Sequence, residues 1–236
     1  LTLVTGVQTC ALPILSIMPC IAKKYECQRP EMNASGYQDV DCVLTTRELA
    51  KMIRIAGLSF DALPEEEFDH PLGLGSGAGA IFGTSGGVME AAIRTVYEVV
   101  TGKEPQSLDF TACRGHEGIK EATLDLGGTP VKVAITNGLK NARVLMEKIR
   151  AGEADYQFIE VMCCPGGCVG GGGQPFRTTA AIREHRMDGL YQVDKKLALR
   201  QSHKNPDIQT LYSEFLHEPN SHLAHELLHT HYADRS

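Results

Sequence analysis

Cysteines are the residues of this 236-residue chain that point most clearly to chemistry. Two stretches stand out, MPCIAKKYE (residues 18–26) and FIEVMCCPGGCVGGGGQP (residues 158–175), and each places its cysteines after an apolar run. Their cysteines are Cys20 in the first, and Cys163, Cys164 and Cys168 in the second. Ligands in α/β folds are held at the carboxyl ends of strands, so thiolates placed there can converge on one cavity. Soft thiolates from distant parts of a chain favour zinc or an iron-sulfur cluster.

Glycines surround Cys168 and let the backbone approach a bulky inorganic group while offering N–H donors. The plainer interpretation is that these cysteines are small buried apolar residues. This interpretation is as good as ligation for Cys20, and it fits the Cys164–Cys168 pair less well. The other thiols, Cys27, Cys42 and Cys113, have no such surroundings and are predicted to be core or surface residues. The cysteines are too unevenly spaced for a disulfide scaffold, which predicts a reducing, cytoplasmic location.

Charge and hydropathy exclude two classes of protein. The net charge is −6 and no run is rich in lysine or arginine, which argues against nucleic acid as a partner. Apolar stretches are interrupted by glycine or polar residues well before they could span a bilayer, so we expect no membrane anchor. Small molecules, ions or a redox protein remain as partners.

The pattern of elements predicts an α/β fold. Predicted strands cover residues 15–18, 41–44, 110–113, 121–126, 131–136 and 158–161, and predicted helices cover residues 45–56, 88–100, 139–150, 178–192, 206–216 and 222–229. Composition changes after Pro175, where glycine nearly vanishes and histidine, leucine and arginine rise. Residues 73–87 are rich in glycine without nucleotide-loop spacing, and we interpret them as a tight turn near the cysteine cavity.

The first residues differ in kind from the rest. Residues 4–14, VTGVQTCALPI, resemble an in-frame translation of a sequencing adaptor. Residues 1–14, with Cys10, are therefore not expected to contribute to function. The predicted organisation is 1–14 as a non-native segment, 15–176 as a catalytic domain and 177–236 as a helical region.

The two cysteine loops resemble cluster-binding signatures of the iron-only (FeFe) hydrogenases. The segments between them, NASGYQDVDCVLTTRELAKMI (residues 33–53) and GAGAIFGTSGGVMEAA (residues 77–92), are similar to the family as well. The last 60 residues resemble the family's small-subunit region. The resemblance implies part of a two-lobed α/β catalytic fold with a C-terminal helical appendage wrapped around its outside.

The resemblance also implies a ligand set. Cys20, Cys164 and Cys168 match thiolates that hold a 4Fe-4S cluster, and Cys168 matches the thiolate that bridges this cubane to a di-iron subcluster. Lys23 matches a lysine that hydrogen-bonds a cyanide ligand of the di-iron unit, for which a charged flexible donor is well suited.

Three further residues lie in the same two signatures. Met18 and Met162 match methionines that pack around the di-iron unit, and ordinary core packing is compatible with that role. Glu26 matches a glutamate of the motif, although a surface charge explains it equally well.

The implied reaction is the reversible reduction of protons to dihydrogen, with electrons from a ferredoxin-like or NAD-linked partner and a cluster installed by hydrogenase maturation factors. Two departures from the family's pattern weaken this implied reaction. The family's first signature, which supplies the fourth cubane thiolate, is missing, and Cys163 stands where a small residue is expected. We therefore predict that the chain as given does not form a working site.

Three alternatives remain. HELLH (residues 225–229) fits the HExxH zinc-protease pattern, but only seven residues follow it, and a partly solvated amphipathic helix is the competing interpretation. An iron-sulfur assembly protein related to the hydrogenases would share several of the cysteines. A cluster-bearing redox sensor would share the signatures. Lys23 and the intact GGGQP loop favour the catalytic branch.

Overall fold

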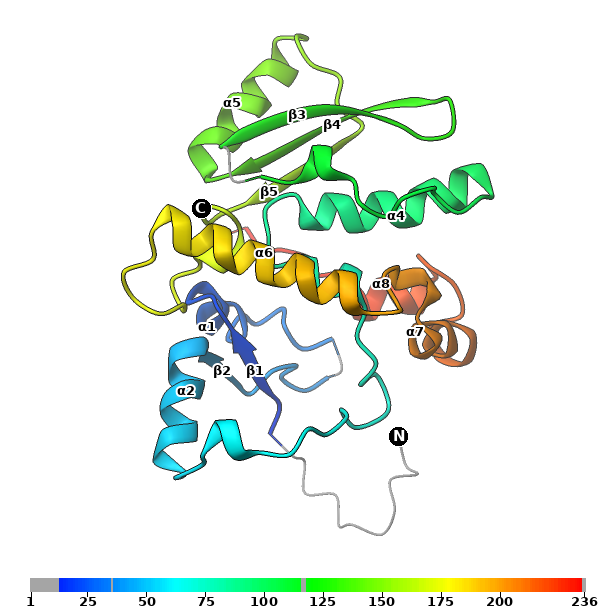
Figure 1. Cartoon of the computed structure of the whole chain (residues 1–236). Helices are drawn as coiled ribbons and strands as arrows, with labels where there is room; N and C mark the ends of the chain where they lie inside the picture. The colour runs from blue at the N-terminus through cyan, green and yellow to red at the C-terminus, as the bar shows by residue number, and fades with distance from the viewer. Residues whose placement is uncertain (1–12, 35, 116–117, 235–236) are drawn as a thin grey trace.

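The computed structural model describes residues 13–34, 36–115 and 118–234, and it contains two small sheets (Figure 1). The strands are β1 (Leu15–Met18), β2 (Cys42–Thr45), β3 (Ile119–Asp125), β4 (Pro130–Asn137) and β5 (Phe158–Met162). β1 and β2 form a parallel pair. The second sheet has the order β3-β4-β5, in which β3 and β4 form an antiparallel hairpin and β4 and β5 are parallel.

Helices surround and separate these sheets. They are α1 (Ala22–Glu26), α2 (Thr46–Ile55), α3 (Gly77–Ile81), α4 (Gly87–Thr101), α5 (Leu139–Arg150), α6 (Ala180–Lys196), α7 (Pro206–Leu211) and α8 (His222–Leu228). Figure 1 shows α6 crossing the molecule between the two sheets. The predicted α/β class and nearly all predicted elements are confirmed.

Local capping explains why these boundaries could be predicted. Thr45 caps α2 through a capping box, in which its side chain accepts from the Glu48 N–H and Glu48 accepts from the Thr45 N–H. Gly102 ends α4 in the left-handed conformation, with φ 65°.

Two predictions about local structure are wrong. Residues 110–113 form a 3₁₀ turn (Thr111–Cys113) rather than a strand, and the Phe110 N–H donates to the Glu90 carboxylate (3.3 Å) instead of to a neighbouring strand. The glycine-rich segment is also more than a turn, because it contains α3. A Cβ on Gly77 would lie 2.1 Å from Asp194 Oδ1, so α3 can pack this closely against α6 only with glycine there.

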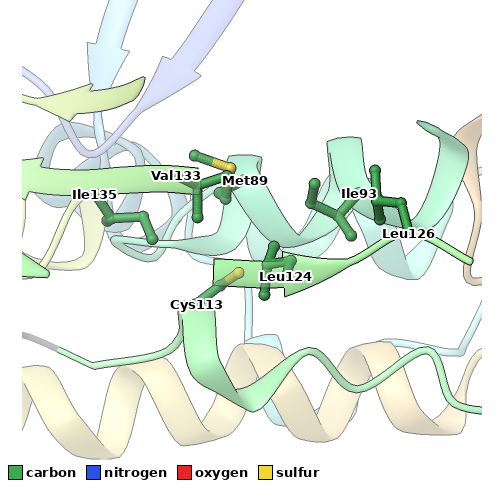
Figure 2. Close-up of a cluster of buried hydrophobic side chains, with 7 residues drawn as sticks. All are labelled: Met89, Ile93, Cys113, Leu124, Leu126, Val133 and Ile135. Atoms are coloured by element: carbon green, nitrogen blue, oxygen red, sulfur yellow. The ribbon is translucent and has the colours of Figure 1, made fainter. Parts of the chain in front are cut away.

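The main hydrophobic core lies between α4 and the β3-β4 hairpin (Figure 2). Its buried members are Met89, Ile93, Cys113, Leu124, Leu126, Val133 and Ile135. The core covers one face of the sheet that ends in the second cysteine loop, so it fixes the direction in which β5 delivers that loop.

A buried charge network joins α4 to α6 and to the segment after it. Arg94 is fully buried and donates to both oxygens of Asp194 (2.7 and 2.9 Å) and to Glu90 (2.8 Å), while its remaining N–H groups donate to backbone carbonyls. Arg114 donates to both oxygens of Glu90, and Arg200 donates to Asp194. All donors of Arg94 are satisfied, which a buried charge requires.

This network corrects the expectation that the appended helices wrap the outside. α6 is a central element, because Met187, Tyr191 and Asp194 are all buried. A Cβ on Gly83 would lie 2.7 Å from a methyl carbon of Leu190, so the glycine-rich segment lies directly against α6.

Arg94→Ala should lower the free energy of unfolding by about 3–5 kcal/mol, because it leaves buried carboxylates unpaired. Urea denaturation followed by circular dichroism measures this change. Lys148→Ala is the matched control, since Lys148 pairs with Glu121 at the surface (2.9 Å), where an ion pair contributes under about 1 kcal/mol. Equal losses in the two variants would contradict the importance of the buried network.

Candidate metal centre

Both cysteine loops begin where a parallel-paired strand ends. Met18 is the last residue of β1 and Met162 is the last residue of β5. Cys20 follows the first strand after Pro19, and two cysteines follow the second strand directly. The predicted placement at the carboxyl ends of strands is confirmed by these bounds.

The backbones of the two loops are in direct contact. The Gly173 N–H donates to the Pro19 carbonyl oxygen at 2.9 Å. A Cβ on Gly171 would lie 2.1 Å from that oxygen, and one on Gly173 would lie 2.8 Å from the Pro19 carbonyl carbon. Glycine is therefore required at both positions, and its absence of a side chain lets the segment after Cys168 lie against Pro19 and Cys20.

A third segment, Gly83 to Ser85, supports the second loop from another side. The Ser85 N–H donates to the Gly166 carbonyl (3.0 Å), and the Val169 N–H donates to the Gly83 carbonyl (3.0 Å). A Cβ on Gly167 would lie 2.7 Å from the Ser85 nitrogen, and φ of Gly167 is 90°. The glycine-rich segment thus positions the cysteine loop through main-chain contacts.

These contacts place the segment of Cys20 beside the loop that carries Cys164 and Cys168. Cys20, Cys164 and Cys168 are all free and partly exposed. Burial raises the pKa of Cys168, and the neighbouring thiols Cys20 and Cys164 raise it further. Burial also raises the pKa of Cys164, followed by the effects of Cys20 and Cys163, while the Gly172 N–H opposes this rise. The three thiols therefore affect one another's charge, although they belong to distant parts of the sequence.

Lys23 lies close enough to this group to act on it. Its charge opposes the rise in the pKa of Cys168. The ammonium group also pairs with Glu26 one turn later on α1 (2.6 Å), where both side chains are only partly exposed. The pair gives the cysteine group a cation next to a carboxylate.

The remaining cysteines lie elsewhere. Cys113 belongs to the hydrophobic core, where burial raises its pKa to about 12. Cys27 is buried and donates to the Lys24 carbonyl (3.3 Å), and Cys42 is exposed. Cys163 is exposed. Cys10 lies outside the described residues.

The donor set fits a cluster better than a single ion. Among the residues that the structure describes, no three His, Cys, Asp or Glu side chains are close enough to share one metal ion. Ligands of one zinc ion must crowd around it, because each sulfur is about 2.3 Å from the metal. A cubane spreads its cysteines over several irons, so its thiols can lie farther apart. Three thiols that are too far apart for one ion suit that arrangement.

Two arginines that the sequence analysis did not single out hold the carbonyl groups of this loop. Arg186 of α6 donates to the Val169 carbonyl (2.8 Å), and Arg47 of α2 donates to the Gly172 carbonyl (2.8 Å). Glu160, buried on β5, accepts from the first N–H groups at the start of α4. Nothing in the local sequence signals these contacts, because their partners lie far apart in the chain.

The HELLH segment does not form a zinc-protease site in the described part of the chain. The rings of His225 and His229 lie side by side, with centroids 4.5 Å apart. Glu226, which such a site would use as its base, lies 3.9 Å from His222 instead. These side chains are exposed on α8, in agreement with the solvated-helix interpretation.

Sequence comparison identifies the family. Residues 8–172 match the C-terminal domain of the iron-only hydrogenase large subunit, and residues 180–235 match the iron hydrogenase small subunit. The NADP-reducing hydrogenase subunit HndD of Solidesulfovibrio fructosivorans is 48% identical over 231 residues, covering 98% of this chain and 39% of the relative. The periplasmic Fe hydrogenase large subunit of Nitratidesulfovibrio vulgaris is 57% identical over 192 residues, covering 80% of this chain and 46% of the relative.

Two more distant relatives also match, and the name of the second describes a different role. Protein NAR1 of Arabidopsis thaliana is 32% identical over 235 residues, covering 92% of this chain and 49% of the relative. Cytosolic iron-sulfur assembly component 3 of Rattus norvegicus is 31% identical over 226 residues, covering 92% of this chain and 47% of the relative.

Solved structures agree with the sequence comparison. A variant of FeFe-hydrogenase HydA1 from Chlamydomonas reinhardtii has a TM-score of 0.76 and 43% identity, covering 93% of this chain and 63% of that one. The mixed α/β fold, with helices at the C-terminus, matches that of the hydrogenase domain.

The chain belongs to the iron-only hydrogenase family, and it joins the C-terminal domain of the large subunit to a small-subunit region. It spans less than half the length of the curated relatives described above. Within the described ranges no helix has the length and apolar character needed to cross a bilayer.

Gly171→Ala should reduce the iron bound per chain after anaerobic reconstitution, because its Cβ would push the loop away from Pro19. Iron and acid-labile sulfide analysis measures the effect. The matched control is Gly189→Ala on α6, where a Cβ meets nothing within 4 Å and iron binding should be unchanged. Full iron content in the Gly171 variant would contradict the role assigned to the backbone contact.

Proposed function

We propose that the protein is the catalytic part of an iron-only hydrogenase, which reversibly reduces protons to dihydrogen. The observation that carries the proposal is the contact of Gly171 and Gly173 with Pro19, which brings the loop of Cys164 and Cys168 against the segment of Cys20. In this account the three thiolates would hold a 4Fe-4S cluster, and Cys168 would serve both this cluster and a di-iron subcluster. When bound, this pair of iron units supplies the electron transfer and the proton reduction.

The protein's own residues have separate tasks in this account. Lys23 donates a charge-assisted hydrogen bond from Nζ to an anionic ligand, and Glu26 holds that ammonium group in place (2.6 Å). Met18 and Met162, at the ends of their strands, line the site with apolar, adaptable side chains and limit access of water.

Three cysteines leave one position of the cubane without a described thiol ligand. We propose that a longer form of the protein, comparable in length to its relatives, supplies the fourth thiolate. Electrons would then arrive from a ferredoxin-like or NAD-linked partner, and hydrogenase maturation factors would install the di-iron unit. The name of the HndD relative, an NADP-reducing hydrogenase subunit, supports a nicotinamide-linked partner. A cytoplasmic location is proposed from the free thiols.

The second candidate function is iron-sulfur cluster assembly, which is favoured by the relative named as a cytosolic iron-sulfur assembly component. Such a protein would bind a cluster with several of the same cysteines. Lys23 beside the cysteine group and the intact GGGQP loop (residues 171–175) favour the hydrogenase instead. A cluster-bearing redox sensor would share every one of these features.

The test is dihydrogen evolution by the full-length protein that the gene encodes, produced with hydrogenase maturation factors and supplied with a reduced low-potential dye. Evolution should occur and should disappear in Cys168→Ser. Cys42→Ser is the matched control, because Cys42 is exposed and outside the group, and it should retain activity. Bound iron without any evolution in the unaltered protein would favour the assembly or sensor function.

Lys23→Ala should lower the rate of evolution by at least about tenfold, because it removes a charge-assisted donor. Cubane iron content, determined by electron paramagnetic resonance after reduction, should be retained. The control is Lys24→Ala, since the Lys24 ammonium group donates to the Val43 carbonyl (2.9 Å) and to Glu48. Unchanged activity in the Lys23 variant would argue against its proposed role.

A further inference from the structure

Glu160 of β5 caps the start of α4, a helix that lies far from it in the sequence. Its Oε1 atom accepts from the Gly86 N–H (2.6 Å), and its Oε2 atom accepts from the Met89 N–H (2.8 Å). Gly86 is the N-cap residue of α4, and it has no side chain that could accept such bonds. The strand therefore supplies the cap that the sequence of the helix lacks.

The helix start in turn stabilises the carboxylate. Glu160 is only 5% exposed, and both of the bonds it accepts come from backbone N–H groups at the positive end of the α4 dipole. Burial raises the pKa of Glu160, and the N–H groups of Gly86 and Met89 oppose this rise. A buried carboxylate that loses its donors is costly, so β5 and the start of α4 cannot slide independently of each other.

The residue just before this cap holds the second cysteine loop. The Ser85 N–H donates to the Gly166 carbonyl (3.0 Å), which lies between the two ligand cysteines of that loop. On the other side, β5 ends two residues after Glu160 and leads directly into the same loop. The strand, the loop and the start of α4 therefore form a closed circuit of contacts, and Glu160 is its link on the strand side.

We propose that Glu160 is a positioning residue for the metal centre, which fixes the cysteine loop against the start of α4 and so keeps Cys164 and Cys168 in place. The inference rests on the proposed function, because it requires that this loop holds a cluster. Both carboxylate oxygens are needed, since each accepts from a different N–H. Glu160→Gln offers one acceptor oxygen and turns an amide NH2 group toward the other backbone donor.

The first measurement is hydrogen–deuterium exchange, followed by mass spectrometry, on the full-length protein with and without bound iron. In Glu160→Gln, residues 163–170 of the iron-free protein should exchange at least about tenfold faster, while α5 keeps its protection. A helix cap with no further role would change exchange only in the first turn of α4. Exchange in the loop therefore separates positioning from capping.

Ser221→Ala is the matched control, because it also removes a helix cap. The Ser221 hydroxyl accepts from the Ala224 N–H (3.1 Å) at the start of α8, which is a different helix from the one that Glu160 caps. Its loss should leave exchange of residues 163–170 unchanged.

Iron content and the electron paramagnetic resonance spectrum of the reduced cubane provide the second readout. After anaerobic reconstitution, Glu160→Gln should bind less iron per chain, and its spectrum should broaden because the loop adopts several positions. Glu160→Asp keeps the charge beside the helix start but is shorter, so it should fold even where the glutamine variant does not, with intermediate changes.

Two results would overturn the inference in the variants that fold. One is loop exchange equal to that of the unaltered protein, and the other is faster loop exchange with iron content and spectrum unchanged. Absence of any iron in the unaltered protein would instead overturn the proposed function. Exchange of the iron-free protein would then still test whether Glu160 holds the loop.

Discussion

The close contact between the glycine-rich loop and the Pro19 carbonyl is the constraint on which the metal centre depends. Cys20 and Cys168 are separated by most of the chain, and they share an environment only because Gly171 and Gly173 present bare backbone to Pro19. A single methyl group at Gly171 would occupy the space of the carbonyl oxygen. The glycines thus determine the distance between the two halves of the ligand set, while the cysteines provide the chemistry.

The small-subunit region also helps to hold the cysteine loop in place. The buried pair of Arg94 and Asp194 fixes α6 against α4, and α6 in turn places Arg186 on the Val169 carbonyl beside Cys168. Side chains from the small-subunit region and from the large-subunit domain therefore hold one loop. This explains why α6 lies between the sheets and why its two buried polar side chains, Tyr191 and Asp194, are both hydrogen-bonded.

Features fixed by nearby residues could be predicted from the sequence. The start of α2 follows from Thr45 and Glu48, and the end of α4 follows from Gly102, because each cap is completed within four residues. The predicted strand at Phe110 was wrong because the carboxylate of Glu90, twenty residues away, takes its N–H. Such long-range competition leaves no local pattern to read.

The same distinction applies to the metal centre. The cysteines and Lys23 were predictable because their types and spacing carry the signal of ligation and charge. Arg47 and Arg186 were not, since each is an ordinary helical arginine until the fold brings it to a carbonyl on another segment. The places of Gly171 and Gly173 were indicated only in general terms by the density of glycine.

The most direct test of the central claim is an anomalous difference map at the iron absorption edge, from crystals of the full-length protein grown without oxygen. The account predicts iron density bounded by the sulfur atoms of Cys20, Cys164 and Cys168. Iron located elsewhere, or these three cysteines lying apart with no iron among them, would contradict it.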